Sequence, residues 1–294
     1  MKKSYNTNLI LVFLISILTL YLVNSKLITT SIIEYTNLYL TKLFPSSFII
    51  FILINLILNY NPIHKMSKII KKPSPIYVLI ISMISGFPGG PKNISLLYKN
   101  NLLTKTTSNL LLKSTHYPNP LFVLGPISIL LKSKSLASKI LSSLILSNLF
   151  IYIKNYNKYE YSSLPKQQEK SFSSSLAESI ISSAKLQILI YGTNLFFYLF
   201  SVLITKSINF SITNYVLING LFDLTKGIFS TALINNQLLK CILIICFISL
   251  GSISIHIQIK SILSDANLSY KSFLQGRIIT TILSLIFFLL IYNL

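Results

Sequence analysis

The stretch Ser85-Gly86-Phe87-Pro88-Gly89-Gly90-Pro91-Lys92-Asn93 follows an apolar run at residues 76–84. Three glycines and two prolines fall within six residues and interrupt any helix. Glycine loses more conformational entropy on ordering than any other residue, and Pro91 has no backbone N–H group to donate a hydrogen bond. Inside a membrane such a break must be covered by protein or line a wet cavity, since bare peptide groups are costly in hydrocarbon. The alternatives are a kinked helix packed against its neighbours and a binding site of the kind that transporters build.

Composition places this break in a membrane protein. Of the 294 residues, 52% are hydrophobic and 11% are charged, and the mean hydropathy is +0.67. Several apolar runs are shorter than the roughly 20 residues of a straight span, which favours re-entrant or broken helices. We expect one membrane domain over 1–294, an all-α polytopic helical bundle with about seven to nine full spans and two re-entrant or interfacial elements. The runs fall at about 8–23, 46–59, 75–88, 118–131, 136–153, 187–205, 212–222, 227–234, 240–257 and 273–292.

The first run follows Met1-Lys2-Lys3 and has the outline of a signal peptide. No Ala-x-Ala site follows it, because the first alanine of the chain is Ala137. We therefore expect an uncleaved first span within 1–24. The lysines before this span, those at 65–72 and those of a polar loop at 154–172 are candidates for the cytoplasmic side.

The net charge is +20, from 26 basic and 6 acidic residues. The basic residues are scattered singly between apolar runs, so no nucleic-acid partner is expected. Two explanations of the lysine excess stay open. One is compositional bias of the genome. The other is functional: the lysines orient the protein in the membrane, attract anionic lipid and create a positive electrostatic potential that suits an anionic solute.

Motifs of hydrolytic, metal or nucleotide chemistry are missing from the sequence. It contains no HExxH, CxxC, G-x-S-x-G or Walker A pattern, and its three histidines are far apart. Cys241 and Cys246 are five residues apart on different faces of a helix, so no disulfide between them is expected. We expect a protein that is not an enzyme and has no cofactor or metal.

Similarities between the two halves of the chain, 27–153 and 173–294, predict that they are two inverted repeats of one unit. Glu34 followed by 46–58 resembles Glu178 followed by 190–203, and residues 136–153 match 273–290. The break at 86–92 matches residues 221–227, and Gly125 matches Gly251. The alternative is chance self-similarity of a Leu/Ile/Ser-rich sequence. The weaker segments 27–43 and 173–186 are expected to form interfacial helices or re-entrant arms.

A second polar break reads Asn219-Gly220-Leu221-Phe222-Asp223-Leu224-Thr225-Lys226-Gly227. An acid amid apolar runs is costly in a membrane and is by default a functional candidate. The alternative is an Asp223–Lys226 ion pair at i, i+3 on one helix face.

Two further stretches are either structural elements or parts of a binding site. Ser114-Thr115-His116-Tyr117-Pro118-Asn119-Pro120 is either an entry turn or a set of donors at the mouth of a span, with a kink expected at Gly125-Pro126. Residues 251–260 alternate polar and apolar side chains, and we expect an extended or partly helical stretch beside a cavity. His256 there is either structural or a hydrogen-bonding group of the site.

Several of these stretches resemble the YlbJ-type (SpoVV) sporulation integral membrane proteins. The resemblance extends from about Leu43-Phe44-Pro45 to the last apolar run. It is carried by residues 85–92, Leu102-Leu103-Thr104-Lys105, Pro120-Leu121-Phe122, residues 221–227 and residues 252–258. That family carries a nucleoside-recognition Gate domain and is similar to concentrative nucleoside transporters. The chain departs from the family at Pro91, which replaces a small residue, at Asp223, which is usually Glu, and at 115–119.

The resemblance implies a transporter of the outer forespore membrane that moves dipicolinic acid, a small dicarboxylate. The alternatives are a non-transporting scaffold for spore envelope assembly and a transporter of nucleosides or another solute. The expected partners are the lipid bilayer, a small anionic solute and a coupling ion, H⁺ or Na⁺, and the oligomeric state stays open. Asp223 and His256 are the candidates for ion coupling. The candidates for binding the solute are Gly86, Pro88, Gly89, Gly90, Lys92, Asn93, His116, Asn119, Thr225, Lys226, Gly227, Ser254 and Gln258.

Overall fold

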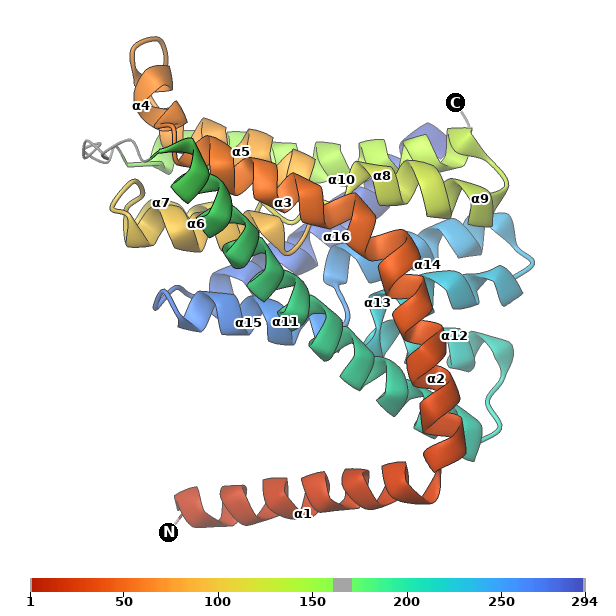
Figure 1. Cartoon of the computed structure of the whole chain (residues 1–294). Coiled ribbons are helices and arrows are strands. Elements are labelled where there is room, and N and C mark those ends of the chain that lie inside the picture. Colours follow the sequence, from red (N-terminus) through yellow and green to blue (C-terminus); the bar gives the residue numbers. More distant parts are fainter. Residues whose placement is uncertain (1, 161–170, 293–294) are drawn as a thin grey trace.

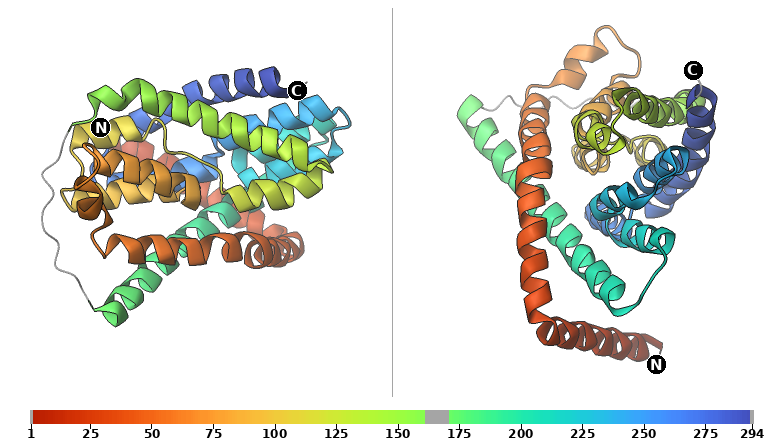
Figure 2. Two further views of the ribbon diagram at one scale, coloured as in Figure 1. Left: turned by 90° about the horizontal axis from the view of Figure 1, so that it is seen from above. Right: turned by 90° about the vertical axis from the view of Figure 1, so that its right-hand side faces the viewer.

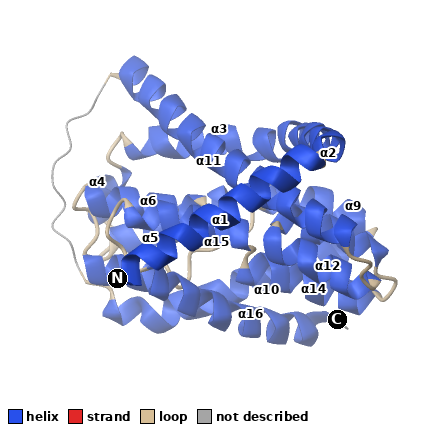
Figure 3. Cartoon of the chain, turned by 90° about the horizontal axis from the view of Figure 1, so that it is seen from below, coloured by secondary structure: helices blue, strands red, loops and turns tan. Residues whose placement is uncertain are grey.

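The computed structural model describes residues 2–160 and 171–292 (Figure 1). Across these residues the chain consists of helices joined by loops, with no strand, and the expected all-helical membrane bundle is confirmed (Figure 3). Five segments at most have the length and apolar composition of a span, fewer than the about seven to nine expected, because breaks divide the other apolar runs into shorter helices. Four are Lys134–Lys158, Phe172–Ser207, Gln237–Ser264, which contains a short break at Gly251-Ser252, and Tyr270–Tyr292. The fifth is a bent pair, Thr7–Val23 with Ser25–Leu43.

The bent pair begins the chain. Helix α1 (Lys2–Val23) projects from the body of the molecule, and the chain turns by 92° into α2 (Ser25–Leu38) (Figures 1 and 2). Phe13 packs edge-on against Phe200 at 6.2 Å between ring centroids, while most apolar side chains of α1 are exposed. An apolar exposed helix of this length fits the expected first span.

Each half of the chain contains one long helical segment where a separate polar arm was expected. Residues 27–43 continue through α2 and the wider turn η1 (Tyr39–Leu43) into α3 (Phe44–Leu58). Residues 173–186 are the first part of α11 (Phe172–Ser207), a helix of 36 residues. Neither segment is a separate element, and the expectation of interfacial helices or re-entrant arms stays a prediction, since a bent pair such as Thr7–Val23 with Ser25–Leu43 is either a broken span or a re-entrant loop. Pro45 lies in the first turn of α3, where it needs no donor, and no glycine or proline interrupts α11 before Gly192.

The remaining elements follow the same order in both halves: a long helix, two broken helices, then a straight helix. In the first half the broken helices are α5 (Pro73–Ser85) with α6 (Gly89–Lys99), and α7 (Lys105–Leu111) with α8 (Pro120–Phe122), η2 (Val123–Ile127) and α9 (Ser128–Leu131), before α10 (Lys134–Asn155). In the second half they are α12 (Ile212–Phe222) with α13 (Leu224–Ser230), and α14 (Gln237–Leu250) with α15 (Ile253–Ser264), before α16 (Tyr270–Tyr292). The inverted repeat stays a prediction, and this common order is consistent with it.

The region 251–260 was expected to be extended or partly helical, but only Gly251 and Ser252 leave the helical conformation. Helix α15 satisfies the peptide groups that follow, as a membrane environment demands. Its i, i+4 spacing places Ser254 and Gln258 on one buried face. Near Gly125-Pro126 the chain forms the wide turn η2, and Ser128 Oγ donates to the carbonyls of Leu124 (2.6 Å) and Gly125 (2.8 Å).

The connecting loops gather at shared ends of the bundle. Lys72 Nζ donates to the Tyr156 carbonyl at 2.9 Å, which places the lysines of 65–72 next to the end of α10. Ser269 N donates to Asn109 Oδ1 at 2.9 Å, which brings the α15–α16 connection to α7 at 105–111. Part of the expected polar loop, residues 161–170, lies outside the described residues. Both cysteines are free, as expected.

Candidate functional site

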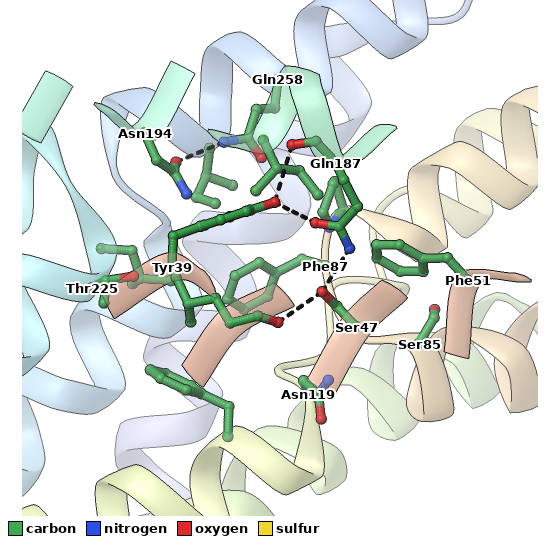
Figure 4. Close-up of a pocket in the computed structure, with 16 residues that line it drawn as sticks. Tyr39, Ser47, Phe51, Ser85, Phe87, Asn119, Gln187, Asn194, Thr225 and Gln258 are labelled. Atoms are coloured by element: carbon green, nitrogen blue, oxygen red, sulfur yellow. Dashed lines mark hydrogen bonds between the residues drawn. The ribbon is translucent and has the colours of Figure 1, made fainter. Parts of the chain in front are cut away.

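A cavity lies where the broken helices of both halves meet the two long helical segments (Figure 4). Its volume is about 70 Å³, which is room for several waters. Its walls are apolar and aromatic with a few polar groups, the composition of a small-molecule site. The lining residues are Tyr39, Leu43, Ser47, Phe51, Ser85, Phe87, Pro88, Asn119, Phe122, Gln187, Ile190, Asn194, Leu224, Thr225, Ile255 and Gln258.

The first break is built by glycines that pack against protein. Gly86 has φ +67°, and a Cβ there would lie 2.6 Å from the Asn119 amide nitrogen. A Cβ on Gly90 would overlap the Thr115 carbonyl oxygen, and one on Gly89 would overlap the Ser85 side chain. Gly86 and Gly90 therefore let this break approach the extended segment 114–119 rather than a solute. Of the four predicted residues Gly86, Pro88, Gly89 and Gly90, only Pro88 lines the cavity.

The second break is held by Asp223, which caps α13. Its Oδ1 accepts the Lys226 backbone amide at 2.7 Å, while Oδ2 is buried without a hydrogen bond among the described residues. A Cβ on Gly227 would overlap the Gly220 backbone, so α12 and α13 form a closely packed hairpin. The Lys226 ammonium donates to Ser201 Oγ at 3.0 Å. The alternative of an ion pair between the Asp223 and Lys226 side chains is therefore not what the structure has. Asp223 caps the backbone of α13, and the Lys226 ammonium binds Ser201 instead.

The polar lining is ordered by side-chain hydrogen bonds. Gln258 Nε2 donates to Asn194 Oδ1 at 2.7 Å, and Gln258 Oε1 is buried without a partner among the described residues. Gln187, from the same helix α11 as Asn194, donates through Nε2 to Ser47 Oγ at 2.7 Å, and the Tyr39 hydroxyl donates to the Gln187 carbonyl at 3.0 Å and to Gln187 Oε1. An unpaired amide oxygen and nearby hydroxyls leave capacity to bind water or a solute.

Of the predicted solute-binding residues, the structure brings Pro88, Asn119, Thr225 and Gln258 together at the cavity. Asn119 also caps α8, with Oδ1 accepting Leu121 N at 2.9 Å. The predictions missed the groups from the long helices, Tyr39, Ser47, Gln187 and Asn194. One signal was present: Gln187 and Asn194 are seven residues apart in an apolar run, so they share a helix face.

Several other predicted residues lie away from the cavity lining. His116 is buried, stacked on Phe87 at 4.6 Å between centroids, with Phe273 edge-on. His256 Nδ1 is 2.8 Å from the Tyr270 hydroxyl. Asn93 is buried within α6, and Ser254 Oγ lies 2.8 Å from Ser252 Oγ. Lys226 lines a second cavity with Glu34 and Tyr198, and Gly227 packs in the hairpin.

Lys92 lies in a separate groove between α6 and α11, together with Glu178 and Lys185. It was expected to supply a counter-charge to the solute, and the structure places its side chain outside the lining of the central cavity. We therefore expect Lys92→Ala to change anion affinity by less than about threefold, since the half-buried Lys92 does not line the central cavity and its charge in an open groove is screened by salt. Equilibrium binding at physiological salt checks this, and a tenfold loss would place Lys92 in the site.

Among the described residues no group of three or more His, Cys, Asp and Glu side chains is arranged to hold a metal ion. These features define a class of protein: a multi-pass helical membrane protein whose broken helices surround a small cavity with apolar and aromatic walls and a few polar groups.

The sequence is 22% identical over 259 residues to the sporulation integral membrane protein YlbJ of Bacillus subtilis (strain 168). The match covers 74% of this chain and 64% of that protein, so the chain spans less than two thirds of the length of its relative. This similarity confirms the resemblance to YlbJ-type sporulation membrane proteins. No family model matches the sequence, so the Gate domain stays an inference from resemblance. No solved structure matches either.

Proposed function

We propose that this protein is a sporulation membrane transporter of a small anionic solute, with dipicolinic acid as that solute. The observation that carries the proposal is a cavity at which the breaks of both halves meet, lined by Pro88 from one and Thr225 from the other. Transporters bind their substrates at such meetings of discontinuous helices, because irregular backbone is tolerated in a membrane where it lines a cavity.

The lining suits an anion with a flat ring. It contains no carboxylate, and its amide and hydroxyl groups supply hydrogen-bond donors. Helices α6 and α15 begin at the cavity, with Pro88 as the cap of one and Ile255 in the first turn of the other. Helix N-termini favour negative charge. Phe51, Phe87 and Phe122 offer ring faces, and the net charge of +20 favours the approach of anions.

The proposed mechanism is alternating access, in which one half moves against the other around the cavity. Thr225 lines both the central cavity and a second cavity of about 310 Å³ beside Lys226, and we propose that the solute passes from one to the other at this residue. Asp223 is the preferred group for coupling to H⁺ or Na⁺, because one oxygen of this buried carboxylate is unpaired. His256 is the second candidate.

The relative's name supports a place in sporulation, and we propose the outer forespore membrane. The lysines at 65–72 and 154–158 share one end of the bundle, which we assign to the cytoplasmic side of that membrane. The proposal is for a carrier rather than an enzyme.

Uptake into proteoliposomes tests the function. Labelled dipicolinate and labelled uridine are offered separately to vesicles with the purified full-length protein and to empty vesicles. We expect protein-dependent uptake of dipicolinate and little of uridine. Uptake of uridine alone would favour a nucleoside transporter, and uptake of neither would favour the scaffold for envelope assembly.

A further inference from the structure

Arg277 is the single arginine of the chain and is fully buried in α16. Its acceptors are neutral oxygens. Nη1 donates to the carbonyls of Ser249 (3.4 Å) and His116 (3.5 Å), and Nη2 donates to the Lys113 carbonyl (3.3 Å) and Asn148 Oδ1 (3.4 Å). A guanidinium stays charged in proteins, and a buried charge without an ionic partner is costly. The neighbours of Arg277 must therefore account for how this buried charge is stabilised.

The position of Arg277 is fixed by its neighbour Gly276. A Cβ on Gly276 would lie 2.8 Å from the Lys113 carbonyl carbon and still closer to its oxygen, so α16 is packed directly onto the end of α7. The Phe273 ring lies 5.2 Å from the guanidinium carbon and covers the group from another side. The guanidinium is thus held between the end of α7 and the end of α14.

The two ends that Arg277 joins are both helix C-termini. Ser249 lies in the last turn of α14, and Lys113 lies in the turn that ends α7. Free carbonyls give a helix C-terminus a partial negative charge. Beyond the same two breaks, α8 and α15 begin and lead to the cavity through Asn119 and Ile255.

We infer that Arg277 sets the charge preference of the central cavity, because it neutralises the carbonyl ends of α7 and α14 and leaves the amide ends of the opposite half-helices to dominate. Arg277 acts as a positioning and electrostatic residue and does not touch the solute. Its contact at His116 is three residues from Asn119, a chain distance of about 10 Å. At that distance one buried charge changes the affinity for a monoanion by on the order of tenfold.

The test compares three ligands of one shape and different charge on the purified full-length protein. Pyridine-2,6-dicarboxylate is a dianion at neutral pH, pyridine-2-carboxylate is a monoanion, and pyridine-2,6-dicarboxamide is neutral. For Arg277→Met we expect the affinity for the dianion to fall by on the order of a hundredfold and that for the monoanion by on the order of tenfold, while the affinity for the neutral diamide stays unchanged. Arg277→Lys keeps the charge without the planar fork, so the dianion affinity is expected to stay within about tenfold of wild type.

Thermal stability of the variants separates this role from a structural one. Both substitutions remove hydrogen bonds, so both lower the melting temperature. Arg277→Gln serves as a second neutral variant that keeps donors for the carbonyls. An equal loss for all three ligands in the neutral variants would overturn the inference, and so would a Lys variant that binds as poorly as Met.

The inference rests on the proposed function, and different results would contradict the role of Arg277 and the proposed function. If the wild-type protein binds neither anion, the proposed function is wrong and Arg277 has no anion site to serve. If the wild-type protein prefers the dianion and the neutral variants keep that preference, only the role of Arg277 is wrong. If both neutral variants fail to fold and a folded Arg277→Lys variant binds the three ligands equally, the charge serves folding and the inference is also overturned.

Discussion

Gly90→Ala is expected to destabilise the protein strongly, because the new Cβ would overlap the Thr115 carbonyl oxygen and approach Ser82 Oγ to 3.0 Å. A backbone atom has little freedom to move aside, so the cost is at or above the roughly 1–3 kcal/mol of ordinary overpacking. For a chain of this size that corresponds to a fall in melting temperature of on the order of 5–10 °C. Thermal unfolding of the purified protein in detergent measures it.

The matched control is Gly192→Ala in α11. A Cβ on Gly192 meets no atom within 4 Å, and alanine favours the helix by about 1 kcal/mol over glycine. We therefore expect the control to melt at or slightly above the wild-type temperature. Gly227→Ala in the other break should behave like Gly90→Ala, since its Cβ would overlap the Gly220 backbone. Equal melting temperatures for all three variants would show that the breaks are not closely packed.

Gln258→Leu is expected to reduce dipicolinate uptake by tenfold or more. The substitution removes the Gln258 amide, whose Nε2 has a second hydrogen to donate to a carboxylate, and it leaves Asn194 Oδ1 without the donor 2.7 Å away. An unsatisfied buried polar group costs about 1–3 kcal/mol, and 1.4 kcal/mol is tenfold in an equilibrium constant. Initial rates in proteoliposomes at several dipicolinate concentrations check this.

The control for this variant is Gln275→Leu, the same substitution at an exposed position of α16. It should keep wild-type uptake. Both variants are compared at equal protein content and after their melting temperatures are measured. If Gln258→Leu transports at the wild-type rate, the lining amide has no part in binding the solute.

The sequence predicts the breaks of this fold well and the lengths of its helices poorly. Glycine and proline mark residues 86–91, and Gly220 and Gly227 mark the second break, because the chain needs them there for close backbone contact. The segments 27–43 and 173–186 are polar enough to suggest separate elements, yet they continue into the following apolar runs. Their polar faces are satisfied by tertiary contacts such as Tyr39 with Gln187, which local pattern does not reveal.

The site was predictable where its residues lie at a break and not where they come from a long helix. Pro88, Thr225 and Gln258 were expected and line the cavity, whereas Asn194 and Tyr39 were not expected. Lys92 is adjacent in sequence to the first break but turns to another face of α6. Arg277 carried a signal of its own, since a lone charge inside an apolar run at 273–292 marks function by default.

Protection of a cysteine at Thr225 by the solute tests the central claim most directly, because Thr225 lines the cavity on the side of the second break. The two native cysteines are first replaced by alanine, and Thr225→Cys is then labelled with a small thiol reagent in the presence and absence of dipicolinate. Ser138→Cys on the exposed face of α10 is the control. We predict that saturating dipicolinate slows labelling at residue 225 several-fold and leaves residue 138 unchanged. An unchanged labelling rate at residue 225, with the protein folded, would contradict a solute site where the two breaks meet.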